Sequence, residues 1–158
     1  MKNKGQTLLE ITVALGAILI TLAAIAVVVT ASVNNSVFIK NQTQSGKYAQ
    51  QGMEYVRYLR NNNPSTYLGL SGTYCFDDGN IFRSITNPTN PCDITKVNLA
   101  GAFIRTAVFD TGAECGSANR VTVNVSWSSG KCQGANRFCH KSSLVSCFSD
   151  QTNPVPAL

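Results

Sequence analysis

A run of about 23 uncharged residues, ITVALGAILITLAAIAVVVTASV from Ile11 to Val33, decides the fold of this chain. It contains no proline, so nothing in it interrupts a helix. Roughly 20 apolar residues in a helix are enough to cross the hydrocarbon core of a bilayer. We therefore expect a membrane-spanning helix. Lys2 and Lys4 precede it, and they favour an N-terminus on the cytoplasmic side.

The residues after this run continue the helix and then give way to a second pattern. An apolar stripe returns at helical spacing, at Ala49, Met53, Val56 and Leu59 or Arg60. The sequence Asn61-Asn62-Asn63-Pro64 is a helix stop signal. We expect one helix from about residue 7 to about residue 60, whose last turns pack on a globular head. Gly46 and Gly52 lower the helix propensity midway and suggest a flexible stretch.

Beyond Pro64 the hydrophobic period changes from helical to alternating. The clearest strand covers residues 121–127, where Val121, Val123, Val125 and Trp127 fall on one face. Weaker strand patterns cover residues 81–85, 103–109 and 138–148. A proline-containing loop is expected at 87–91 and a frayed tail at 151–158.

These patterns predict an α+β fold, in which a long N-terminal helix packs on a small antiparallel β-sheet held by disulfides. We divide the chain into a leader (1–5), a transmembrane and assembly helix (6–33), a helix extension (34–63) and an extracytoplasmic β-rich head (64–158).

All six cysteines follow the apolar run, at Cys75, Cys92, Cys115, Cys132, Cys139 and Cys147. An even number of cysteines on one side of a membrane segment predicts disulfides in an oxidising compartment, although the spacing does not select the pairing. Metal binding is the rival explanation. The chain has no C-x-x-C pair and His140 is its only histidine, so we predict no metal and no other cofactor.

Charge and acidic pairs give little support to nucleic-acid binding or catalysis. The net charge is +5, but the basic residues are scattered, so nucleic acid is not an expected partner. The only adjacent acidic pair, Asp77-Asp78, precedes Gly79 and is typical of a turn. No nucleophile and orienting acid accompany His140 in a recognisable pattern, and we expect the protein not to be an enzyme.

The segment just before the apolar run, Lys4-Gly5-Gln6-Thr7-Leu8-Leu9-Glu10, carries the functional information. An ordinary secretory signal is cleaved after its apolar region, whereas cleavage after Gly5 would leave the apolar helix on the protein. Glu10 is a carboxylate near the start of a membrane helix, where an ionisable group indicates function by default. The simpler explanation of Glu10 is an interfacial acid favoured by the helix dipole.

With these residues, the first third of the chain resembles the prepilin leader of type IV pilins and of secretion and competence pseudopilins. The resemblance implies that prepilin peptidase cleaves between Gly5 and Gln6 and that the new amine of Gln6 is methylated. It further implies that Glu10 pairs with the Gln6 amine of a neighbouring subunit during assembly. The chain departs from many family members in having Gln6 in place of Phe, and in having Val27–Val29 where a proline is common.

The resemblance implies a structural subunit, a minor pilin or pseudopilin, stored in the cytoplasmic membrane and then assembled into a cell-surface filament. Its partners would be prepilin peptidase, other pilin subunits, the inner-membrane assembly platform and, before assembly, membrane lipid. A surface pilus (fimbrium), a secretion pseudopilus and a DNA-uptake fibre all stay open. The main alternative is an uncleaved single-pass protein that presents an extracytoplasmic binding or adhesion module.

A filament subunit that also binds a ligand is a third possibility. Four aromatic residues, Tyr67, Tyr74, Phe76 and Phe82, lie near Arg83 in the sequence and would suit a sticky patch. Aromatic residues of a small domain more often form its core, and we favour that explanation here.

Overall fold

The computed structural model describes residues 4–79, 81–86, 93–94, 98–116, 118–130, 132 and 137–149, with side chains described from Leu8 onward. The elements are α1 (Lys4–Asn62), α2 (Pro64–Leu68), β1 (Gly72–Phe76), β2 (Phe82–Ser84), β3 (Phe103–Asp110), the short 3-10 helix η1 (Ala113–Cys115), β4 (Asn119–Trp127) and β5 (His140–Phe148). The chain forms two compact units, Met1–Lys40 and Asn41–Leu158, and the second contains the end of α1 together with all the strands.

Helix α1 is one helix of 59 residues, and it runs through both Gly46 and Gly52 without a break. Within its apolar part, the hydroxyl group of Thr21 donates to the carbonyl of Ile18 at 2.8 Å, so the threonine brings no unpaired polar group. The helix ends where the sequence predicts. The side chain of Asn63 accepts a hydrogen bond from the Thr66 amide, and Pro64 begins the short helix α2.

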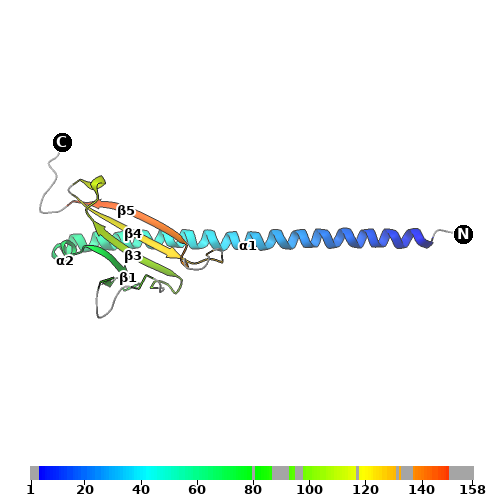
Figure 1. Cartoon of the computed structure of the whole chain (residues 1–158), viewed down its shortest axis with the longest axis horizontal. Coiled ribbons are helices and arrows are strands. Elements are labelled where there is room, and N and C mark those ends of the chain that lie inside the picture. Colours follow the sequence, from blue (N-terminus) through cyan, green and yellow to red (C-terminus); the bar gives the residue numbers. More distant parts are fainter. Residues whose placement is uncertain are drawn as a thin grey trace. The chain divides into compact units, whose positions relative to one another are not determined.

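The strands form a single antiparallel sheet in the order β2-β1-β3-β4-β5, which confirms the predicted α+β fold. In Figure 1 the strands lie side by side across the C-terminal part of α1. The longest pairings join β3 to β4 and β4 to β5, from Phe103 opposite Trp127 to Asp110 opposite Arg120, and from Asn119 opposite Phe148 to Trp127 opposite His140. The predicted strands at 103–109, 121–127 and 138–148 are confirmed, and the one at 81–85 is reduced to three residues in β2.

The core lies between the end of α1 and one face of the sheet. Val121, Val123 and Val125 are fully buried on β4, and they alternate with partly exposed polar residues, as predicted. The helix contributes the apolar stripe that the sequence indicates, and its buried members are Ala49, Met53, Val56 and Leu59. The helix thus buries residues three or four apart, and the strand buries every second residue. The two elements pack face to face and form a two-layer core.

At Gly52, α1 approaches the sheet closely. A β-carbon at this position would lie 2.7 Å from Cζ of Phe76 and 3.0 Å from Cγ1 of Val123. Real β-carbons essentially never lie within 3.0 Å of other atoms, so the Phe76 ring or the helix would have to shift if residue 52 were any larger. Gly52 therefore permits close packing, and it is not a break in the helix.

Arg105 is the one buried charged side chain among the described residues, and it joins three parts of the head. Its guanidinium donates to the carbonyl oxygens of Asp77 at 2.6 Å and Phe76 at 3.3 Å, and to that of Tyr48 on α1 at 3.5 Å. The guanidinium also lies 4.1 Å from the centre of the Phe76 ring. Burial lowers the pKa of Arg105 and the nearby Asp78 opposes that shift, but a guanidinium stays protonated. The charge is thus held by carbonyl groups and an aromatic face.

We expect Gly52→Ala to destabilise the head by about 1–3 kcal/mol, because the added methyl group overpacks the contact with Phe76 and Val123. Gly46→Ala is the matched control. Nothing lies within 4 Å of its β-carbon position, and alanine raises helix propensity by up to about 1 kcal/mol. Denaturant unfolding of the detergent-solubilised protein, followed by the fluorescence of Trp127, measures both. A Gly52→Ala variant as stable as Gly46→Ala would contradict the packing described here.

Candidate functional site

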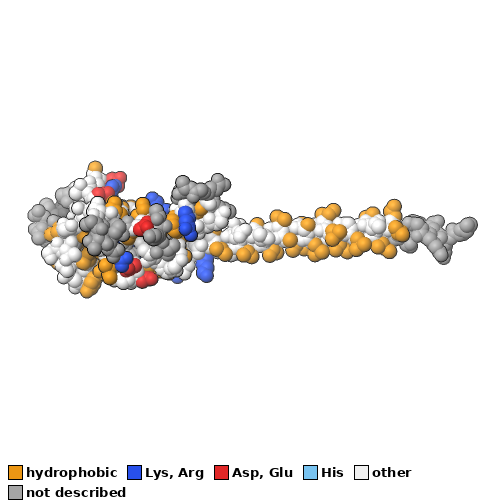
Figure 2. Space-filling model, turned by 60° about the horizontal axis from the view of Figure 1, so that its bottom comes forward, with side chains coloured by type: hydrophobic (Ala, Val, Ile, Leu, Met, Phe, Trp, Pro, Cys, Tyr) orange, Lys and Arg blue, Asp and Glu red, His pale blue; other side chains and the backbone are white. Residues whose placement is uncertain are grey.

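The N-terminal part of α1 leaves its apolar side chains exposed. Among the described residues, α1 from Leu8 is the one helix long and apolar enough to cross a membrane, by its length and composition. Figure 2 shows hydrophobic side chains along this part of the helix. The exposed large hydrophobic residues between Leu8 and Val33 are Leu8, Leu9, Ile11, Val13, Leu15, Ile18, Leu19, Ile20, Leu22, Ile25, Val27, Val28, Val29 and Val33.

Exposing these apolar side chains to water would cost too much free energy. Removing one Val, Leu or Ile side chain from water is worth about 1.5–3 kcal/mol. More than ten such side chains together exceed the roughly 5–15 kcal/mol by which a whole domain is stable. The segment from Leu8 to Val33 therefore needs an apolar environment, either lipid or the helices of other chains.

The predicted assembly residues lie at the start of this segment. Gly5 and Gln6 belong to the first turns of α1, and Glu10 follows Gln6 by four residues, which is one turn on the same side of the helix. The Glu10 side chain is exposed, and no ion pair of Glu10 occurs among the described side chains. The site thus has a carboxylate at one end of an apolar surface that carries no other charge as far as Val33.

Disulfides close the head, which confirms that part of the prediction. Cys115 pairs with Cys147 and Cys132 pairs with Cys139, with Cα atoms 5.5 and 5.4 Å apart. Cys75 is also disulfide-bonded, whereas Cys92 lies outside the described residues. The first bond joins η1 to the end of β5, and the second joins the connection after β4 to the residue before β5.

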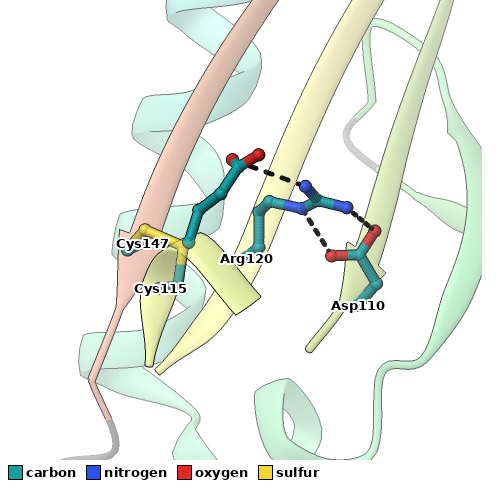
Figure 3. The surroundings of a disulfide bond; sticks show 5 residues. Asp110, Cys115, Arg120 and Cys147 are labelled. Atoms are coloured by element: carbon teal, nitrogen blue, oxygen red, sulfur yellow. Dashed lines mark hydrogen bonds and ion pairs between the residues drawn. A yellow bond between two sulfur atoms is a disulfide. The ribbon is translucent and has the colours of Figure 1, made fainter. Parts of the chain in front are cut away.

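An ion pair lies beside the Cys115–Cys147 disulfide (Figure 3). Arg120 on β4 donates two hydrogen bonds to the carboxylate of Asp110, which is directly opposite on β3, at 2.7 and 2.8 Å. Glu114 lies further from the same guanidinium, at 3.6 Å. The hydrogen bonds from Arg120 lower the pKa of Asp110, and those to Asp110 raise the pKa of Arg120.

The connection between β4 and β5 gathers three side chains that can bind metals. The ligand atoms of Cys132, Cys139 and His140 lie within 4.8 Å of one another. Both sulfurs are used in the disulfide, and Nε2 of His140 lies 2.8 Å from Oγ of Ser129, while its ring stacks on Trp127. A cysteine sulfur in a disulfide is not available as a metal ligand, so these residues form a disulfide next to an aromatic contact and not a metal site.

The aromatic residues considered for a sticky patch belong to the core. Tyr67 and Phe76 are buried, at 2% and 1% exposure, and the Phe82 ring packs 4.9 Å from that of Phe76. Tyr74 meets the rings of Phe82 and Phe109 edge-on. Arg83 is engaged with the carboxylate of Asp77 at 3.1 Å, and Asp77 also accepts from the amide of Gly79, as expected for a turn.

We compared the chain with protein-family models, with curated proteins and with solved structures, and none of the three gave a match.

We expect the Asp110–Arg120 pair to make the head sensitive to acid. The pKa of Asp110 is lowered on folding, so its contribution to stability is present above its unfolded value of about 3.9 and is lost as the pH falls through the folded pKa. Asp110→Asn lacks this titration and should lose less stability than the parent between about pH 6 and about pH 2.5. The urea midpoint of Trp127 fluorescence measures the difference. Equal losses in the two proteins would exclude a role for this pair.

Proposed function

We propose that the chain is a structural subunit, of the minor pilin or pseudopilin kind, in a filament resembling a type IV pilus. The observation that carries the proposal is the exposed apolar surface of α1, which begins within the Gly5–Glu10 motif and continues along the helix that leads into a folded head. This surface needs a membrane in the free subunit and neighbouring helices in an assembly. A catalytic role has no comparable support.

Cleavage after Gly5 would place a new positive charge close to Glu10. The amine of Gln6 would start the helix, and Glu10 would lie about 6 Å further along the axis. Either charge alone in an apolar bundle is strongly unfavourable, and the resemblance to pilins implies that a neighbouring subunit supplies one partner of the pair. We propose that this requirement fixes the axial offset between subunits and that methylation modifies the same amine.

The head would then be extracytoplasmic. Its disulfides require an oxidising compartment, and Lys2 and Lys4 would keep the leader on the cytoplasmic side until prepilin peptidase removes it. We propose that the subunit waits in the cytoplasmic membrane and passes from lipid into the filament through the assembly platform. An uncleaved single-pass protein presenting the same head is the competing function, and leader processing separates the two.

The first test is processing. We expect the protein purified from membranes that contain prepilin peptidase to begin at Gln6, with one methyl group on its amine. Intact mass and N-terminal sequencing measure both features. Gly5→Leu is the control, since it blocks the small-residue cleavage position while leaving the apolar helix unchanged. A terminus at Met1 or Lys2 in the parent protein would favour the uncleaved anchor.

The second test is assembly. We expect Glu10→Ala to be inserted and cleaved like the parent but to enter filaments at least about tenfold less, because the new amine loses its buried partner. Glu54→Ala is a matched control, because Glu54 is an exposed acid of the same helix and pairs only with Arg57 among the described residues. Subunits in sheared filaments are compared with those in membranes by immunoblot. Normal incorporation of Glu10→Ala would remove Glu10 from the mechanism.

A further inference from the structure

The face of the sheet that points away from α1 is hollowed. Residues Thr106 on β3 and Asn124 on β4 are direct partners in the sheet, and they point away from the core because Arg105, Ala107, Val123 and Val125 point into it. Together with Thr73 on β1 and Ser126 on β4, they line a hollow of about 640 Å³. This volume falls within the roughly 300–1,000 Å³ of small-ligand sites.

The floor of the hollow is polar but uncharged. Its hydroxyl and amide groups come from three neighbouring strands and can both donate and accept hydrogen bonds. Asn124 is oriented by the hydroxyl group of Ser143, which donates to its amide oxygen at 2.7 Å. Such groups suit a ligand that carries several hydroxyl groups.

Apolar side chains form part of the wall. Ile104 and Val108 come from β3, and Phe138 comes from the segment that precedes β5. An aromatic ring beside hydroxyl-binding groups is suited to the C–H face of a sugar, because the ring offers a flat apolar surface next to the polar floor.

The charged residues among the described lining of the hollow are all positive. Arg137 and Lys141 are exposed and line it, and no Asp or Glu is present among its described lining residues. Asp93, which precedes Ile94 in the chain, is not part of the lining. Two cations beside a neutral floor complement a single carboxylate, and they are too few for the run of phosphate contacts that nucleic-acid binding requires.

We propose that this hollow binds a carboxylated sugar of the hexuronate type. The carboxylate would lie at Arg137 and Lys141, the hydroxyl groups would bond to Thr106, Asn124 and Ser126, and the ring face would lie against Phe138. The C-terminal part of α1 packs on the opposite face of the sheet and does not occupy the hollow. Binding therefore belongs to the single subunit and can be tested whether or not filaments form.

The test is a titration of the isotope-labelled full chain in micelles of a zwitterionic detergent without a sugar head group, followed by amide chemical shifts. The probes are glucuronate, glucose, which lacks the charge, and acetate, which lacks the ring. We expect glucuronate to shift Thr106, Asn124 and Ser126 with saturation in the millimolar range. Glucose should bind about fivefold more weakly, because it lacks the one or two exposed ion pairs. Acetate should also bind more weakly, because it lacks the hydroxyl groups and the ring face.

The variant Arg137→Gln/Lys141→Gln should lose the preference for glucuronate over glucose, and each single substitution should reduce it. Lys47→Gln is the control, because Lys47 is an exposed cation on α1 and does not line the hollow. The unperturbed shifts of Val123 and Trp127 report that each variant is folded. Equal binding of glucose or acetate, shifts that lie elsewhere on the head, or an unchanged preference in the double variant would overturn the proposal.

Discussion

The apolar side chains between Leu8 and Val33 must be kept from water, and nothing in the described part of the chain does so. The same helix meets the opposite condition further on, where Met53 and Val56 are buried against the sheet. Helix α1 therefore has two parts. The apolar side chains of its first part need lipid or other chains around them, and those of its last part are buried by the protein's own sheet. The order of the sequence, apolar all round and then apolar on one side, produces this change without any break in the backbone.

The head has two sheet faces with different chemistry, and the alternation along β4 separates them. Val121, Val123 and Val125 face α1, while the residues between them, such as Asn124 and Ser126, are partly exposed. A shift of one residue in the pairing with β3 would exchange these two sets, so the buried valines hold the register strongly. The close approach at Gly52 and the carbonyl contacts of Arg105 then hold the helix on its side of the sheet.

The sequence predicts well those elements in which a hydrophobic pattern repeats over many residues. The helix, its end near Pro64 and the strands β3, β4 and β5 all follow from repeated spacing. The elements that the sequence analysis does not predict are short.

Strand β1 has only five residues with no clear alternation. Helix α2 also has five residues, and it directly follows the helix stop signal at the end of α1, where a loop is expected. Arg105 was missed because a lone arginine in a strand looks exposed until the carbonyls of Phe76 and Asp77 are placed around it. The polar floor of the hollow follows in part from the sequence, because the polar residues of β4 alternate with its valines. Arg137 and Lys141 are distant from these residues in the sequence, and only the fold brings them to the hollow.

The two described disulfides have a mechanical meaning for β5. This strand lies at the edge of the sheet and pairs only with β4. Cys139 fixes the chain just before the strand begins, and Cys147 fixes it one residue before the strand ends. A pulling load along the chain therefore passes from Cys115 directly to Cys147 through the covalent bond. Strand β4 and the part of β5 before Cys147 lie inside the loop that this bond closes, so their hydrogen bonds do not carry the load.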